Sequence, residues 1–366
     1  MLLVLTVVLV ALIFTYTNGF HDTANAIATV VGTKVLTPRQ AIILATITNL
    51  LGAMVGAAVA KTIASGLVDA KLIPPDFASQ MLICALLAAI FWNLLTWYFG
   101  LPSSSSHALV GGLCGAALAT AHGNWHAIIW SKAPEPGKYW WTGGGVLYKV
   151  VIPMVISPAL GFLIAFFIMA VLYLSLQKWR PMTVTRTFGF LQLFSSGYMG
   201  FSHGTNDAQK TMGIIALALV AATKAGTFAN LPEGLHFLKT DEPLPGKTLE
   251  IALWIKVICA LTMAAGTAIG GWRIIKTLGH KLVKLQPVHG FAAETAGATV
   301  LFGTAMLGMP VSTTHVITTS IMGVGAAKRW SALKWSVVER ILWAWILTLP
   351  VSAGIAYGLV KLVQLL

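Results

Sequence analysis

Long apolar runs separated by short polar loops fill almost the whole chain. Many of the runs approach the roughly 20 residues that a helix needs to cross a hydrocarbon core about 30 Å thick. A chain inside lipid must satisfy its own backbone hydrogen bonds, and helices do so without help from water. The pattern therefore predicts an all-α polytopic protein of the cell membrane. The runs are 1–32, 40–60, 80–100, 103–121, 146–176, 187–222, 250–272, 291–308, 310–326 and 341–366.

Composition and the placement of charges support a membrane protein and argue against a nucleic-acid partner. Hydrophobic residues make up 57% of the 366 residues and charged residues 10%, whereas charged residues are about 25% of a soluble domain. The formal net charge is +13, but the basic residues lie in short loops and form no basic face or RNA-binding motif. Cys84, Cys114 and Cys259 lie in apolar runs without paired spacing, so we expect neither a metal nor a redox site from them.

Charged residues divide the longer loops into two groups. Loops 33–39, 177–186, 272–290 and 326–340 together hold thirteen Lys or Arg residues and one acid, Glu339. Loops 61–79, 122–145 and 223–250 hold seven basic and seven acidic residues. Loops rich in Lys and Arg stay in the cytoplasm, so we expect the first group there and the second group outside, with both termini. We expect 122–145 and 223–250 to be exposed and poorly constrained.

Matching segments recur in the same order in the two halves of the chain. With five runs per half, the second half enters the membrane from the opposite side, which gives the inverted repeat of many secondary transporters. We expect a first repeat at 1–176, a cytoplasmic linker at 177–186 and a second repeat at 187–366. Residues 19–22 match 204–207, and residues 100–107 match 308–315. A third match pairs Thr48, Gly52 and Gly56 with Thr262, Gly266 and Gly270. Each of these sets is a small-residue stripe suited to close helix contact.

Three of the eleven acidic residues lie inside apolar runs. An ionisable group at bilayer depth persists mainly where it faces a cavity or a pathway. Asp22 and Asp207 occupy matching positions in over-long runs, so we expect broken helices there and a role in coupling a cation to transport. Glu294 has no counterpart in the first half, where Leu86 aligns. We expect it to serve a cation site or to pair with Lys256 or another basic group.

In each half, a proline is followed by several hydroxyl residues and a histidine. Proline suits the first turn of a helix, and Ser or Thr caps its free N–H groups. A helix N-terminus with such hydroxyls is a ready site for a tetrahedral oxyanion, and two of them could hold one anion from both sides. Lys210, one turn beyond Asp207, could balance that carboxylate or contact the anion. The hydroxyl residues are Ser104, Ser105, Ser106, Ser312, Thr313 and Thr314.

Carboxylates beside an oxyanion favour phosphate and predict a coupled cation. Phosphate keeps one or two protons at pH 7 and can donate a hydrogen bond to an aspartate, whereas sulfate has none to donate. A bound proton or metal cation can balance the excess negative charge. Four histidines flank these segments, and we expect them to fix the turns by hydrogen bonds or to carry a proton. They are His21, His107, His203 and His315.

These segments resemble the signature of the inorganic phosphate transporter (PiT) family, and the likeness to its bacterial low-affinity permeases covers nearly the whole chain. The family implies a dimeric symporter with inverted repeats, re-entrant hairpins and a central phosphate site. Its members couple phosphate to sodium or to protons, the latter often with a metal–phosphate substrate. From their positions in the matching motifs, the resemblance implies that Asn25 binds phosphate and that Asn206 takes part in cation coupling. The segments are 18–26, 202–207, 102–107 and 310–315.

The chain departs from the family's general motif, Gly-Ala-Asn-Asp-x-Ala-Asn-Ala, in both halves. Phe20 and His21 replace Ala-Asn in the first half, and Lys210 stands at the position of the second asparagine in the other half. These features resemble the proton-coupled bacterial branch. We expect the coupling ion to be either a proton or sodium.

Three other functions share some of these features. A sulfate permease of the same architecture would use the same hydroxyls. An intramembrane serine hydrolase would need Ser105 or Ser106 beside His107, but residues two apart on a helix point in different directions and no Gly-x-Ser-x-Gly elbow is present. A passive anion channel would not need carboxylates in its path. We therefore expect a phosphate importer that is not an enzyme and holds no cofactor or resident metal. Its expected partners are phosphate, a proton or sodium ion, the lipid bilayer and a second copy of the chain.

Overall fold

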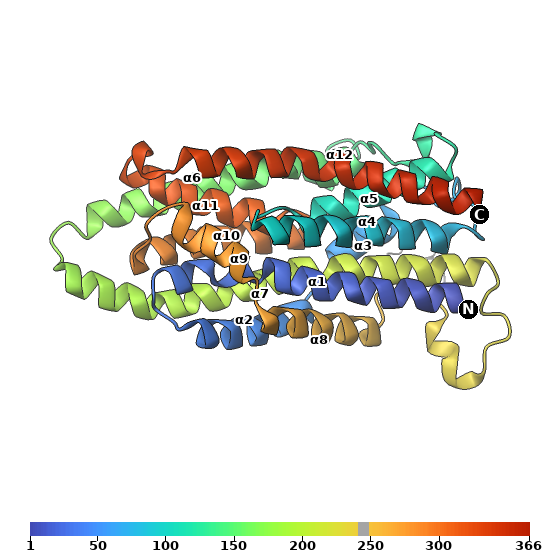
Figure 1. The fold of residues 1–366 in the computed structure, drawn as a ribbon, viewed down its shortest axis with the longest axis horizontal. Coiled ribbons are helices and arrows are strands. Elements are labelled where there is room, and N and C mark those ends of the chain that lie inside the picture. The colour runs from blue at the N-terminus through green and yellow to red at the C-terminus, as the bar shows by residue number, and fades with distance from the viewer. Residues whose placement is uncertain (241–248) are drawn as a thin grey trace.

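The computed structural model describes residues 1–240 and 249–366, and the regular elements of this part are helices, apart from two isolated β-bridges. Figure 1 shows an elongated bundle with most helices running along its long axis. The prediction of an all-α protein is confirmed. The helices are α1 (Leu2–Gly32), α2 (Pro38–Ala53), α3 (Ala58–Ser65), α4 (Ala78–Phe99), α5 (Ser105–Thr120), α6 (Ile152–Ser175), α7 (Pro181–Lys224), α8 (Leu253–Ile269), α9 (Trp272–Lys276), α10 (Pro287–Met306), α11 (Thr313–Lys328) and α12 (Trp335–Leu365).

Four helical stretches in the described residues are long and apolar enough to cross a membrane. They are α1, α4, α6 with the π-helical turn before it, and α12. Two more spans arise if each of two bent pairs counts as one: α2 with α3, bent by 67°, and α8 with α9, bent by 58°. Both bends contain a glycine in the left-handed region, Gly56 with φ 80° and Gly270 with φ 77°. Glycine adopts this conformation without strain, so it permits the bend.

The helix breaks lie at these bends and not at the two aspartates, so the expectation of broken helices there is wrong. α1 runs without interruption through Asp22, and α7 through Asp207. Several polar side chains along them contact neighbouring helices without a break, among them Asp22 and Asn25 of α1. At the α2–α3 bend, Gln209 Oε1 accepts the Val59 N–H at 2.8 Å, which satisfies one of the free donors at the start of α3.

The small-residue stripes pack two helix pairs closely, as predicted. A Cβ atom on Gly52 of α2 would collide with the Phe201 carbonyl oxygen of α7. The matching Gly266 of α8 would collide in the same way with the Tyr16 carbonyl oxygen of α1. Both contacts require glycine, because only a residue without a side chain lets the backbones approach this far.

Two helical hairpins meet near the middle of the bundle (Figure 1). One consists of α4 and α5 and the other of α10 and α11, and their turns begin at Gly100 (φ 65°) and Gly308 (φ 66°). The turns touch each other, since Ser106 Oγ donates to the Val311 carbonyl oxygen at 3.0 Å. Turns buried at the centre of the molecule are the form expected of re-entrant hairpins.

Helices of each half pack against helices of the other half in a matching way. α5 packs on α12 and α11 on α6, while α1 packs on α8 and α7 on α2. This reciprocal packing agrees with two inverted repeats, whose boundaries remain a prediction. The expected linker 177–186 is only partly a loop, because α7 begins at Pro181. The expected loop 272–290 likewise contains α9 and a π-helical turn, Thr277–Lys281.

The two groups of loops lie at opposite ends of the bundle, as their charges predict. The basic loops 33–39, 177–186, 272–290 and 326–340 lie toward the left in Figure 1. Loops 61–79 and 122–145 and the described residues 223–240 lie toward the right with both termini. Of the segments expected to be poorly constrained, 122–145 is held partly by backbone pairing between Lys132 and Gly144. Part of the other, 241–248, lies outside the described residues.

Candidate functional site

α5 and α11 both begin where the two hairpin turns meet. Ser104 Oγ accepts the His107 N–H, and Ser312 Oγ accepts the His315 N–H, both at 3.1 Å. Ser104 and Ser312 are therefore N-caps, a role that Ser fills well. The positive ends of two helix dipoles come together at this point, and the hydroxyls that follow each cap remain for other partners.

The Asp22 carboxylate of α1 contacts hydroxyls from both hairpins. Ser105 Oγ donates to Oδ2 at 2.6 Å, and Thr314 Oγ1 donates to Oδ1 at 3.4 Å. His21 Nδ1 lies 2.7 Å from Oδ1, and its Nε2 lies 3.2 Å from the Thr96 hydroxyl of α4. The carboxylate is buried. These contacts bring hydroxyls of both segments to this aspartate.

The Asp207 carboxylate of α7 is paired with a lysine. Lys210 Nζ lies 2.5 Å from Asp207 Oδ1, and both side chains are 0% exposed. Asn18 Nδ2 donates to Oδ2 at 3.3 Å, and His203 Nε2 lies 3.4 Å from the same oxygen. Lys210 Nζ also donates to Ser106 Oγ. Of the two roles expected for Lys210, the balancing of Asp207 is present in the structure.

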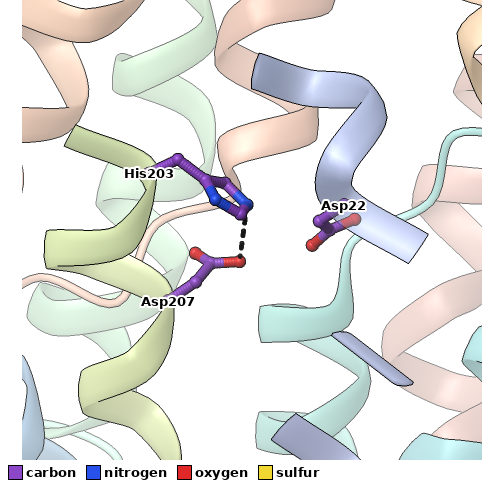
Figure 2. Close-up of side chains that lie close together, drawn as sticks. All are labelled: Asp22, His203 and Asp207. Atoms are coloured by element: carbon purple, nitrogen blue, oxygen red, sulfur yellow. Dashed lines mark ion pairs between the residues drawn. The ribbon is translucent and has the colours of Figure 1, made fainter. Parts of the chain in front are cut away.

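Asp22, His203 and Asp207 form a cluster that could hold a cation. Figure 2 shows the three side chains, with Asp22 on α1 facing the other two on α7. One ligand atom of each lies within 4.8 Å of the others, and all three residues are buried. With His21 and His203 both neutral, the two aspartates and Lys210 leave a net charge of −1. A cation or proton bound here would offset that buried charge.

Asn25 and Lys210, three residues beyond the two aspartates, each contact the hairpin of the other half. Asn25 Nδ2 donates to Thr313 Oγ1 at 3.1 Å and to Thr314 Oγ1 at 2.9 Å. Lys210 makes its contact with Ser106. Each long helix is thus tied to the opposite hairpin at the position where hydroxyls and helix N-termini meet.

Several buried amide atoms beside these contacts have no hydrogen-bond partner among the described residues. They are Oδ1 of Asn18, Oδ1 of Asn25 and both side-chain atoms of Asn206. Buried polar atoms in native structures nearly always have a partner, and these atoms could contact a bound ion or substrate. Asn206 lies next to Asp207 in α7, and its coupling role remains a prediction.

The four flanking histidines behave differently from one another. His21 and His203 contact side chains rather than the turns: His21 lies beside Asp22, and His203 Nδ1 lies 2.8 Å from Asn49 Oδ1. Neither ring nitrogen of His107 has a hydrogen-bond partner among the residues that the structure describes. The ring of His107 instead packs edge-on against His315, with centroids 4.8 Å apart. The backbone N–H groups of His107 and His315 fix the turns.

Glu294 of α10 is buried in a separate polar cluster. Its carboxylate accepts hydrogen bonds from Ser195 Oγ at 2.5 Å, Thr29 Oγ1 at 2.5 Å and Gln192 Nε2 at 3.0 Å. Thr29 is seven residues beyond Asp22 on α1, about 10 Å along the helix. Of the two alternatives for Glu294, an ion pair with Lys256 or another basic group is not found among the described residues, where hydroxyl and amide donors contact the carboxylate. A role in binding a proton or cation remains a prediction.

Several residues of these clusters were not predicted from the sequence. Asn18, Asn49 and Gln192 are lone polar residues in apolar runs, without the repetition that marks the hydroxyl segments. Asn18 aligns with His203 across the two halves, and both contact Asp207. That correspondence is the one signal that could have identified Asn18.

The geometry does not support a serine hydrolase. Ser105 donates to Asp22, and Ser106 donates to the Val311 carbonyl oxygen. The ring nitrogens of His107 have no partner in the described part of the chain, so the arrangement lacks the hydrogen bond from a nucleophile to its base that such catalysis requires.

The sequence matches the phosphate transporter family over residues 18–356. A probable low-affinity inorganic phosphate transporter of Bacillus subtilis (strain 168) is 41% identical, over 99% of both chains. The protein of the same name from Rhizobium meliloti (strain 1021) is 39% identical, over 97% of this chain and 94% of the relative. A solved structure called "The sodium-dependent phosphate transporter" is 24% identical with a TM-score of 0.79 over both full chains, and so shares the fold. The chain belongs to the phosphate transporter family.

Proposed function

We propose that this chain is a symporter that imports inorganic phosphate together with a cation. The observation that carries the proposal is the meeting of two helix N-termini and their hydroxyls with two buried aspartates on α1 and α7. Helix N-termini and hydroxyls suit the anion, and the carboxylates suit the cation. Relatives that are phosphate transporters support the choice of anion.

Phosphate would bind between the tips of the two hairpins. Its oxygens would accept hydrogen bonds from backbone N–H groups, hydroxyls and the Lys210 ammonium, while a phosphate O–H would donate a hydrogen bond to the Asp22 carboxylate. Binding would require the Ser105 and Thr314 hydroxyls to turn from Asp22 to the anion. The proposed phosphate-binding residues are Asn25, Ser105, Ser106, Lys210, Thr313 and Thr314, with the N-caps Ser104 and Ser312 fixing the turns.

The coupling cation would bind between Asp22 and Asp207. The cluster has an uncompensated negative charge before phosphate enters, and phosphate adds one or two more. Buried like charges so close together are unfavourable unless a counter-charge accompanies them. Cation and anion would therefore bind together, which is the basis of symport. Asn206 and Glu294 remain further candidates for the cation or proton path, and a homodimer remains the expected assembly.

Uptake into proteoliposomes tests this function. The purified protein is reconstituted, and radioactive phosphate uptake is measured with a sodium gradient or a proton gradient imposed separately, each with and without magnesium. We expect accumulation above the outside concentration with one gradient, and little inhibition by excess sulfate. Uptake that only equilibrates phosphate under every gradient would identify a passive pathway, and full competition by sulfate would indicate a different substrate.

Loss of one hairpin hydroxyl is expected to weaken phosphate binding. Ser105→Ala or Thr313→Ala should each reduce binding by about 1.5–3 kcal/mol, a usual loss for one hydrogen bond to a charged group. Phosphate affinity of the purified variants provides the measurement. Thr299→Ala is the matched control, because the exposed Thr299 hydroxyl donates only to its own helix. Wild-type affinity in both test variants would show that the site is misplaced.

Loss of an N-cap serine should instead lower the stability of the folded protein. Ser104→Ala and Ser312→Ala are expected to lower the free energy of unfolding by about 0.5–2 kcal/mol, because the His107 and His315 N–H groups would lose their acceptors. Thermal unfolding of the purified variants measures this effect. An unchanged melting temperature in both variants would contradict the capping role.

We also propose that the basic loops face the cytoplasm and that both termini face outward. Lys34 and Lys239 lie in loops of opposite groups and are exposed. Each is replaced by cysteine in a chain whose three native cysteines are changed to alanine. An impermeant thiol reagent applied to intact cells should label the cysteine at position 239 and spare that at position 34. Labelling of both from outside would contradict the proposed topology.

A further inference from the structure

A basic pocket of about 290 Å³ lies at the end of the bundle opposite the termini. Its walls come from the segment before α10, the start of α10, the end of α11 and the turn that follows α11. Four exposed cations and a hydroxyl line it, together with the buried ring of His289. These residues are Lys284, Lys328, Arg329, Lys334 and Ser331.

No carboxylate balances the four cations within the described residues, whose ion pairs all lie elsewhere. The dipole of α11 attracts Lys328 and Arg329 to its C-terminal end. It does not account for Lys284 and Lys334, which come from other segments. Four like charges around one pocket repel one another, so the arrangement favours an anionic ligand.

An apolar pocket of about 390 Å³ adjoins the basic one. The two share a wall, because Tyr173 lines the apolar pocket and its hydroxyl lies 2.9 Å from Nε2 of His289, which lines the basic pocket. Trp179 also lines the apolar pocket, and Trp330 and Trp335 beside the basic one are more than half exposed. Tryptophans gather at the level of lipid headgroups.

We propose that the basic pocket binds the phosphoryl group of an anionic phospholipid, with an acyl chain against the apolar pocket. Basic pockets between membrane helices on the cytoplasmic side suit such headgroups, and the Arg329 guanidinium can bind phosphoryl oxygens in a bidentate manner. α11 separates this pocket from the Asp22–Asp207 cluster by its sixteen residues, about 24 Å of helix. The headgroup would therefore occupy a different place from the transported anion.

The test compares two charge-matched double variants of the full chain. Arg329→Gln with Lys334→Gln removes two pocket cations. Arg39→Gln with Arg186→Gln removes two exposed cations from basic loops outside the pocket. Thermal unfolding is measured in phosphatidylcholine vesicles with and without phosphatidylglycerol. Phosphatidylglycerol should raise the melting temperature of the wild type and of the control variant by about 2–4 °C, and the pocket variant should lose most of this shift.

A second arm distinguishes the lipid from free phosphate. The same proteins are kept in neutral detergent, and their melting temperatures are measured with and without inorganic phosphate. If the pocket variant differs from the control variant only in this arm, the pocket binds free phosphate, and the assignment to a lipid is overturned. If the two variants respond alike in both arms, the pocket binds no phosphoryl group. Neither arm measures transport, so a failure here leaves the proposed symport untouched.

Discussion

Replacement of either Asp22 or Asp207 by asparagine is expected to abolish phosphate uptake against a gradient. Asparagine keeps the size of the side chain and removes the charge that would attract the cation. Each carboxylate also accepts charge-assisted hydrogen bonds, Asp22 from Ser105 and Asp207 from Lys210. One such bond contributes about 1.5–3 kcal/mol, and 1.4 kcal/mol is about tenfold in an equilibrium constant. Concentrative uptake should therefore fall more than about tenfold.

The decisive measurement separates coupling from binding. Uphill uptake and phosphate exchange are measured in the same vesicles for each variant. We expect exchange to survive better than uptake, because the anion would no longer need its cation. Asp→Glu at either position should also fail, since an extra methylene displaces the carboxylate in a packed site. Asp76→Asn, a change at an exposed loop acid, is the matched control.

If both asparagine variants still accumulate phosphate with an unchanged ion dependence, the coupling role lies elsewhere. Glu294 would then be the next candidate, because its carboxylate is buried and has only neutral donors around it. Glu294→Gln measured in the same assay would decide whether the coupling group is Glu294 or the pair of aspartates.

The parts of the fold that recur in both halves could be predicted from the sequence. The matched glycine stripes predicted close helix contacts at Gly52 and Gly266, and both are present. The charge of the loops predicted how they group at the two ends of the bundle (Figure 1). These inferences work because repetition and charge are properties of the sequence itself and need no knowledge of packing.

The position of the helix breaks could not be predicted so well. Polar residues around Asp22 and Asp207 resemble an interruption, but side chains from α5 and α11 and from within α7 satisfy them. The breaks occur at Gly56 and Gly270, the last residues of the two stripes. A glycine that allows close packing and a glycine that adopts positive φ look alike in a sequence, so the stripe predicts contact without revealing a bend.

The candidate site was likewise predictable in its matched parts and not in its unmatched ones. The hydroxyl segments and aspartates occur twice, and the structure brings Ser105 and Thr314 to Asp22. The partners of Glu294 occur once each and are distant in sequence. Only the packing of α1, α7 and α10 brings Thr29 and Gln192 together around that carboxylate.

Lys210→Met is expected to destabilise the protein by about 3–5 kcal/mol, the usual loss when one partner of a buried ion pair is removed. Asp207 is 0% exposed, so its carboxylate would be left without its closest counter-charge. The Asp207→Asn, Lys210→Met double variant removes both charges and should recover most of this stability. Uptake should be absent from the single and the double variant, because both lack a residue of the proposed site. Resistance of the purified proteins to unfolding by dodecyl sulfate is the measurement, with Lys239→Met as an exposed control.

Recovery in the double variant is the informative result, because it separates the pairing of two charges from the packing of the lysine side chain. The interaction free energy follows from the two single variants and the double variant taken as a cycle. If the double variant is as unstable as Lys210→Met alone, the lysine stabilises the protein through its methylenes or its contact with Ser106. If Lys210→Met alone is as stable as the wild type, Asp207 is already neutralised by a proton. The −1 charge inferred for the cluster would then be wrong, and the charge argument for cation binding would have to rest on Asp22 alone.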